Sequence, residues 1–201
     1  MPVRNPLSLA RGPRRFNAAF VVLFAASTLR VASIGAHDDI AATVRKDGDA
    51  VLVSVDCPVR ASRAIAWSVL TDYDHMAGFV TNLQVSEVRT REGDTLLVYQ
   101  SGRAQRGLIS VSFENVREIR LVPQREIRSR MISGTLKSSE FITRIVDDGN
   151  ELHILNNGRF VPNMWVPPLI GPAVIEAETR KQFEEIRNEI LRRSALASRA
   201  S

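Results

Sequence analysis

The feature that most constrains the fold of this chain is a series of short strand-like segments followed by one long amphipathic helix. Turn residues recur at short, fairly even intervals, and β-branched and aromatic residues fill the intervals, as in antiparallel hairpins. The expected turns are Asp47-Gly48, Glu92-Gly93-Asp94, Arg106-Gly107, Pro123-Gln124, Gly134 and Asp147-Asp148-Gly149-Asn150. This order of elements predicts an α+β fold in which a curved antiparallel sheet wraps around the helix.

Two of the segments alternate cleanly between apolar and polar residues. Residues 51–57 and 109–114 repeat with period two, which is the pattern of a strand with one apolar face. The other candidate strands are residues 40–45, 83–91, 95–104, 126–132, 140–146 and 151–160. We expect one undivided domain with a sheet of about six or seven strands.

Helices are expected at two places. Short helices are expected after the first strand, where Pro58 stops the extended pattern and a helix can begin at Ala61 or Ser62 and pack through Trp67. The long helix is expected after the two prolines at 167 and 168 and ends near Arg193. Its apolar residues recur at the spacing of a buried helix face; they are Ile175, Phe183, Ile186 and Ile190.

The first 36 residues have the composition of a secretory signal peptide. Several arginines precede an uncharged run, residues 16–29, and small residues follow up to Ala36. A spanning helix needs about 20 apolar residues, and Arg30 ends this run too early. We expect cleavage after Gly35 or Ala36 and a periplasmic or secreted protein, with an uncleaved N-terminal membrane anchor as the alternative. The expected organisation is a signal peptide (1–36), one domain (37–193) and a flexible tail (194–201).

The charge balance argues against a nucleic-acid partner. The whole chain has 27 Lys and Arg residues against 22 Asp and Glu, but residues 1–36 contain five Arg and no acid, which leaves the mature part balanced. Nucleic-acid binding needs a basic surface, so we expect no such partner. One group of arginines is interpreted as a solvated strand face: Arg117, Arg120, Arg125, Arg128 and Arg130.

The polar residues do not predict catalysis. Asp72, Asp74 and His75 come nearest to a metal or acid–base cluster, but a metal site needs three or four converging ligands with supporting hydrogen bonds. We therefore expect no metal and interpret Asp72 as a cap of the following short helix. His153 is expected to be hydrogen-bonded or exposed, and the single cysteine, Cys57, to be a buried thiol in a strand. No nucleophile-elbow, phosphate-loop, dinucleotide-binding, Cys-x-x-Cys or zinc-protease motif occurs, so we expect no catalytic residue and no cofactor.

Two passages of the chain resemble a known superfamily. The first is Trp67-Ser68-Val69-Leu70-Thr71-Asp72-Tyr73-Asp74, and the second is Asn157-Gly158-Arg159-Phe160-Val161-Pro162 followed by Trp165-Val166-Pro167-Pro168 and the charged helix. They resemble the W-x-V-L-T-D-Y motif and the strand-to-last-helix passage of the polyketide cyclase/dehydrase and START-like superfamily, also called SRPBCC, which includes coenzyme Q-binding proteins. The resemblance covers nearly all of residues 40–193. It implies a helix-grip fold with a pocket for hydrophobic molecules such as lipids, polyketides or isoprenoid quinones, but no particular activity, because one fold hosts many functions.

Candidate pocket residues come from the strands and from the sheet-facing side of the last helix. Ligand pockets are mostly apolar with a few polar anchors, and Tyr99 is a candidate anchor; plain core packing is the alternative for each residue. The candidates are Tyr99, Phe113, Phe141, Ile175 and Phe183.

The stretch before the last helix is a candidate pocket rim. Residues 161–170 contain three prolines, which exclude regular structure, yet the stretch is apolar where a loop is normally polar. Met164, Trp165 and Leu169 are expected to form the rim or to touch a membrane transiently, with Trp165 as a core plug as the alternative. From the shape of the superfamily, Gly134 is expected on the other side of the entrance.

The sequence thus predicts an exported, non-catalytic binding or carrier protein for a hydrophobic small molecule of the lipid, quinone or polyketide type. One alternative is a cyclase, dehydrase or isomerase-type enzyme using the same pocket, which predicts polar groups converging on the pocket and a perturbed ionisable group. The other is a protein-interaction module with a filled core, which predicts no cavity above the ~300 Å³ lower end of usual ligand sites.

Overall fold

The computed structural model describes residues 39–106, 109–163 and 171–200, without the side chains of residues 104–111. The expected signal peptide lies outside these ranges. Within them, no helix combines the length and the apolar composition that crossing a membrane requires.

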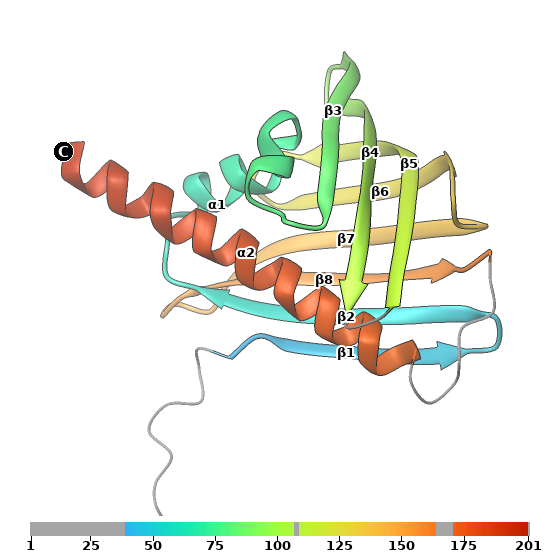
Figure 1. Ribbon diagram of the computed structural model, residues 1–201. Coiled ribbons are helices and arrows are strands. Elements are labelled where there is room, and N and C mark those ends of the chain that lie inside the picture. The colour runs from blue at the N-terminus through green and yellow to red at the C-terminus, as the bar shows by residue number, and fades with distance from the viewer. Residues whose placement is uncertain (1–38, 107–108, 164–170, 201) are drawn as a thin grey trace, which may run out of the picture. The chain divides into compact units, whose positions relative to one another are not determined.

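Eight antiparallel strands form one sheet in the described part of the chain, in the order β1-β2-β8-β7-β6-β5-β4-β3. The strands are β1 Ala41–Asp47, β2 Ala50–Val59, β3 Leu83–Glu92, β4 Thr95–Arg106, β5 Ile109–Val122, β6 Glu126–Gly134, β7 Ser138–Asp147 and β8 Leu152–Val161. The sheet bends strongly, so that β3 to β5 run across the direction of β7, β8, β1 and β2 (Figure 1). The predicted α+β class is confirmed, and the sheet has more strands than the six or seven predicted.

Most predicted turns join consecutive strands. Gly48, Gly93 and Gly149 have φ of +59°, +58° and +93°, a left-handed conformation that glycine adopts without steric cost. The main difference is β5, which continues from Ile109 to Val122, whereas the apolar–polar alternation predicted its end at residue 114. The apolar–polar pattern breaks at Asn115 and Arg117 because these inward positions carry polar side chains, but the strand itself continues through them.

Two short helices follow the first hairpin rather than the first strand. Helix α1, Arg63–Leu70, begins at the predicted cap, where the Ser62 side chain accepts a hydrogen bond from the Ile65 backbone N–H at 3.3 Å. A 3₁₀ helix, η1, follows at Tyr73–Gly78. Helix η1 packs beside β3 and α1 packs on the long C-terminal helix (Figure 1), and the buried Val69, Tyr73 and Met76 join them to the hydrophobic core.

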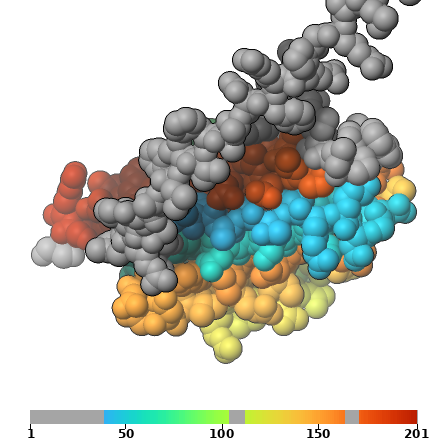
Figure 2. Space-filling view, turned by 90° about the horizontal axis from the view of Figure 1, so that it is seen from below, coloured from blue at the N-terminus to red at the C-terminus, as the bar shows by residue number. Residues whose placement is uncertain are grey.

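One long helix, α2, crosses the inner face of the sheet. It runs from Gly171 to Ala200, so it continues past the predicted end at Arg193 through the expected tail. It packs on β1, β2 and α1 through the predicted stripe, of which Phe183, Ile186 and Ile190 are buried. In Figure 2 the blue and cyan surface of β1 and β2 lies between the orange-red surface of α2 and the orange surface of β7 and β8.

Candidate functional site

The inner face of the sheet is packed at one end of its central strands and partly open at the other. At the packed end, Ile119, Ile127, Ile145 and Ile154 of β5 to β8 are 0% to 6% exposed. Farther along the same strands the inward side chains are only half-buried. We call these residues the open half of the inner face: Phe113, Asn115, Arg117, Met131, Phe141 and Phe160.

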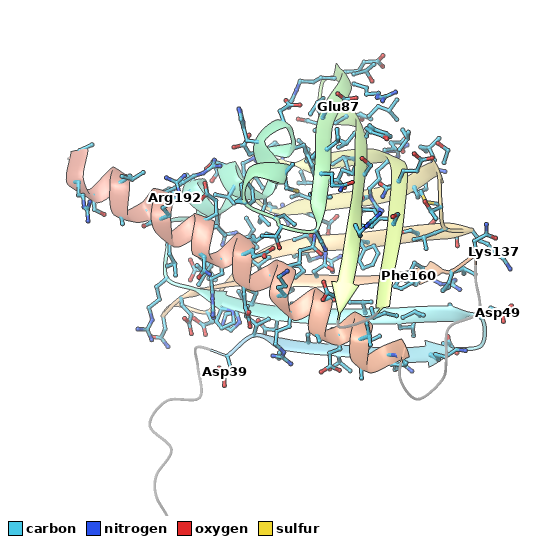
Figure 3. The ribbon with its side chains drawn as sticks, in the orientation of Figure 1. Asp39, Asp49, Glu87, Lys137, Phe160 and Arg192 are labelled. Atoms are coloured by element: carbon cyan, nitrogen blue, oxygen red, sulfur yellow. The ribbon has the colours of Figure 1, made fainter. Side chains whose placement is uncertain are left out.

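Strand register places these side chains on one face. Arg117 pairs with Met131 between β5 and β6, and Ser129, two residues from Met131, pairs with Phe141. Directly paired residues on antiparallel strands point to the same side of the sheet. Phe160, one residue of this surface, is labelled in Figure 3. It lies on the same side of the domain as Lys137 and Asp49, whereas Arg192 of α2 lies on the opposite side.

Two aromatic rings of the open half lie over glycines of the neighbouring strand. A Cβ atom on Gly158 would collide with the Phe141 ring, and one on Gly102 would lie 2.8 Å from Cζ of Phe113. A side chain at either glycine would therefore collide with a ring and also with a backbone carbonyl, that of Asn82 at Gly102 and that of Glu140 at Gly158. This gives a physical role to Gly158, which belongs to the second motif of the sequence.

Arg117 places a positive charge within this surface. Its Nε–H donates to Ser129 Oγ at 2.5 Å, and Nη1–H donates to Ser139 Oγ at 3.3 Å. Its guanidinium carbon lies 5.9 Å from the centre of the Phe141 ring, in range of a cation–π contact. A register shift in the β5–β6 pairing falls between Val116 and Arg117, and such bulges re-aim side chains locally.

Burial changes the titration of Arg117 and its neighbour Tyr73. Burial lowers the pKa of Arg117 to about 10, and the nearby Tyr73 opposes this shift. The side chain as a whole is half-buried, but its guanidinium is largely removed from water. Burial also raises the pKa of the Tyr73 phenol. Near neutral pH Arg117 is therefore positive, and Tyr73 is neutral and cannot compensate its charge.

Further polar side chains line the same region. Gln100, which pairs with Asn115 across β4 and β5, donates to Ser86 Oγ at 3.2 Å. Asn115 Oδ1 is buried without a hydrogen-bond partner. Asn156 donates to Thr143 Oγ1 at 2.7 Å. The inner face thus combines aromatic surface, one cation and an acceptor that lacks a donor.

The structure brings some of the predicted pocket residues together. Phe113 and Phe141 lie in the open half, and Gly134 pairs with Asn115 at its border. Phe183 is buried in the core, where its carbonyl accepts a 3.9 Å contact from the Cys57 thiol. Ile175 is half-buried on α2 against the core.

Tyr99 does not share the face of the other candidates. It alternates with the buried Val98, and its ring stacks on the opposite side of the sheet under Arg89, at 4.4 Å from the guanidinium carbon. It therefore provides no anchor to the inner face. Met164, Trp165 and Leu169, the predicted rim, lie outside the described residues.

Arg117 is the site residue that the sequence pattern did not reveal. The pattern groups it with solvated arginines, and this interpretation is wrong for Arg117, although Arg120, Arg128 and Arg130 do pair with Glu118 or Glu126. The available signal was the period of two from Phe113 through Ile119, which places Arg117 among inward residues.

The motif residue Asp72 connects two helices rather than capping one. No hydrogen bond joins its side chain to the backbone of η1, which corrects the predicted cap. Instead, its carboxylate accepts from Arg193 of α2 at 2.7 Å and contacts His75 at 2.6 Å. Arg193 also donates to Glu189, one turn earlier on α2, at 2.7 Å.

The remaining polar groups have structural partners. Cys57 is fully buried and burial raises its pKa to about 12, so the thiol is not reactive, as expected. His153 contacts Asp56 at 2.7 Å and Asp148 at 3.3 Å. Across the described ranges no group of three or more His, Cys, Asp or Glu side chains is placed to hold a metal ion.

A surface hollow of about 510 Å³ lies at the β6–β7 end and is distinct from the open half. Two of its charged side chains, Glu126 and Arg144, pair at 2.7 Å. A third, Arg63, donates to the backbone carbonyls of Gln124 and Ile145. Because these three side chains already have hydrogen-bond or ion-pair partners, we regard the hollow as a weaker candidate for a ligand site than the inner face.

Comparison with known proteins identifies the fold. No family model and no curated protein matches the sequence. A STAR-related lipid transfer protein from Xanthomonas axonopodis matches with a TM-score of 0.64 and 10% identity, over 76% of this chain and 94% of that chain. A START superfamily protein from Mycobacterium smegmatis matches with 0.59 and 14%, over 70% and 97%. The Zhui aromatase/cyclase from Streptomyces sp. R1128 matches with 0.58 and 15%, over 73% and 94%. The curved antiparallel sheet, the position of α2 and these matches together show that the chain has the helix-grip fold of START/SRPBCC-type proteins.

Proposed function

We propose that this protein is an exported, non-catalytic binding or carrier protein for a hydrophobic small molecule of the lipid, quinone or polyketide type. One observation supports this most: Phe113, Phe141 and Phe160 point to the inner face yet are only half-buried, while the packed end of that face is fully covered. Covering apolar surface contributes about 25 cal/mol per Å², so a ligand that covers ~150 Å² of these rings gains roughly 4 kcal/mol. The lipid transfer protein among the structural neighbours agrees with this proposal.

The test is uptake of a neutral apolar fluorescent probe, N-phenyl-1-naphthylamine, by the full-length chain. We expect saturable binding of one probe per chain, weakened severalfold by Phe141→Gln, because the amide replaces apolar contact surface. Val122→Ala is the matched control, since Val122 is exposed at the end of β5. Absence of saturable binding, or equal weakening by both variants, would contradict the proposal.

An enzyme of cyclase, dehydrase or isomerase type is the second candidate. The observation that favours it is the convergence of Arg117, Ser129 and Ser139 on the open half, together with an aromatase/cyclase among the structural neighbours. Proton transfer near neutral pH is best performed by a group with a pKa close to 7, whereas Arg117 and Tyr73 both keep their protons at that pH. Binding is therefore the better supported function. Recovery of a chemically altered molecule after incubation with the protein would favour the enzyme.

Export is part of the proposal and rests on the sequence of residues 1–36. Cell fractionation of the native host, with the mass of the purified protein, tests it. We expect a chain that begins near His37 and is recovered from the periplasm or the medium. An intact chain in the membrane fraction would indicate the N-terminal anchor instead.

Transient membrane contact through Met164, Trp165 and Leu169 is a further part of the proposal. The chain has two tryptophans, and the other one, Trp67, packs against the core. We expect lipid vesicles to shift the emission of the wild type to shorter wavelength and to leave that of Trp165→Phe unchanged. An equal response from both proteins would contradict the assignment of the contact to Trp165.

A further inference from the structure

The arginines of β5 and β6 differ in their partners according to the side of the sheet on which they lie. Arg120 pairs with Glu118 at 3.1 Å, and Arg130 reaches the same carboxylate at 3.4 Å. Arg117, on the inner face of the same sheet, forms no ion pair with any carboxylate in the described ranges. A charge removed from water without a counter-charge is costly, so the position of Arg117 calls for an explanation.

The described neighbours of Arg117 are uncharged. Ser129 and Ser139 each accept one hydrogen bond from it, and Tyr73 stays neutral because burial raises its pKa. A guanidinium carries five N–H donors. Its Nη2 group has no hydrogen-bond partner among the described residues, so donors remain for an additional acceptor.

Two independent features place a ligand beside those donors. Asn115, next to Arg117 along the inward positions of β5, has a buried Oδ1 that lacks a donor. Phe113, two positions farther, is half-buried and lies over Gly102. Strand residues rise about 3.4 Å each, so Phe113 lies roughly 14 Å from Arg117 along the strand. Polar recognition at one end and aromatic surface at the other match an amphipathic molecule.

We propose that Arg117 binds the acidic group of an amphipathic ligand, a carboxylate or a phosphate monoester, whose apolar part lies against Phe113, Phe141 and Phe160. The inference rests on the proposed binding function and adds the chemical class of the ligand. Arginine suits this role because its planar donors match the oxygens of both groups in a bidentate arrangement. The acidic group neutralises the charge that the protein itself leaves without a partner.

The test compares three ligands that share one alkyl chain. Palmitic acid, its methyl ester and hexadecyl phosphate each displace N-phenyl-1-naphthylamine from the full-length chain. The variants are Arg117→Met, Arg117→Lys and the matched control Arg120→Met, which removes a paired arginine from the outer face of the same strand. The ester reports whether each variant retains a competent site, because it carries no charge.

The acidic ligands are expected to compete at least about tenfold better than the ester with the wild type, as a charge-assisted hydrogen-bonded pair implies. Arg117→Met should abolish this preference without weakening the ester, Arg117→Lys should retain part of it, and Arg120→Met should leave it unchanged. A preference for one acid over the other identifies which acidic group the site takes. Equal competition by acid and ester with the wild type would overturn the role of Arg117 and leave the binding function standing. Lack of competition by all three ligands against a bound probe would overturn the proposed ligand class, and absence of saturable probe binding would overturn the binding function as well.

Discussion

The proposed role of Arg117 implies a cost in stability. Replacing a buried ion pair by apolar residues is often neutral or stabilising, by about 1–4 kcal/mol, and the same desolvation argument applies to the Arg117 guanidinium, which has no counter-charge among the described residues. We therefore expect Arg117→Met to raise the free energy of unfolding of the ligand-free protein by about 1 kcal/mol or more, while Arg120→Met has little effect. Urea unfolding at neutral pH measures both. A loss of stability in Arg117→Met larger than that in Arg120→Met would assign Arg117 a structural role.

His153 is predicted to make the stability of the fold depend on pH. Asp56 and Asp148 raise the pKa of His153 above its ordinary value, chiefly through the hydrogen bond to Asp56. A raised pKa means that the stabilisation is complete below the unfolded value near 6.5 and is lost as the pH rises through the folded value. His153→Gln should thus cost about 0.2–1 kcal/mol at pH 5.5 and less at pH 8.5. Thermal unfolding at the two pH values checks this, and an equal or larger loss at pH 8.5 contradicts it.

At the scale of elements, the turn after α1 and the last turns of α2 are joined by Arg193. Its guanidinium donates to Asp72 and to Glu189. The pKa of Glu189 is lowered to about 2, chiefly by the hydrogen bond from Arg192 and further by that from Arg193. Burial raises the pKa of Asp72, but the hydrogen bonds to His75 and Arg193 outweigh it, so that the pKa is lowered overall. We expect Arg193→Ala to destabilise the domain by about 1–3 kcal/mol, as for charged hydrogen bonds. Arg192→Ala should cost at most about 1 kcal/mol, because Arg192 is 59% exposed and contacts Glu189 alone.

The same contacts predict acid sensitivity. A carboxylate with a lowered folded pKa contributes stability above its unfolded value near 4 and loses it as the pH falls through the folded value. Unfolding measured from pH 7 to pH 2 should therefore show a stability difference between the wild type and Arg193→Ala that begins to shrink near pH 4 and continues to shrink toward pH 2. A difference that stays constant over this range would contradict the ion-pair explanation.

The contact between β7 and β8 depends on the absence of a side chain at Gly158. A methyl group there meets both the Phe141 ring and the backbone carbonyl of Glu140, and the carbonyl cannot rotate away. Gly158→Ala should cost about 1–3 kcal/mol through overpacking and should weaken probe binding by moving Phe141. Gly78→Ala is the control, because a Cβ atom added there would have no other atom within 4 Å. Thermal unfolding of both variants measures the difference, and equal stability would contradict the packing argument.

The elements of this fold follow closely from local sequence, because turns and alternation are local properties. Left-handed glycines end strands where expected, and Ser62 caps α1. Strand β5 exceeds its predicted length, since Asn115 and Arg117 occupy inward positions that the rule of an apolar inner face assigns to hydrophobic residues. The long helix continues past its predicted end at Arg193 to Ala200, and the contact of Arg193 with Asp72 joins residues far apart in the sequence, which local patterns do not reveal.

For the molecule as a whole, the sequence predicted the fold class and two aromatic residues of the inner face, but not the polar residues at its centre. Phe113 and Phe141 were found because aromatic residues in strands are visible in the sequence. Tyr99 was predicted to line the pocket but lies on the opposite face of the sheet, because neighbouring residues of a strand point to opposite faces. The period of two places Arg117 among the inward residues, but its contacts with Ser129 and Ser139 depend on how β5, β6 and β7 pair, which the sequence pattern does not reveal.

The most direct test of the central claim is native mass spectrometry, with organic extraction, of the protein purified from the exported fraction of its own host. We predict a one-to-one adduct that dissociates to release an apolar molecule with a single acidic group. A ligand-free protein that also takes up no neutral apolar probe would contradict the account and favour an interaction module with a filled core.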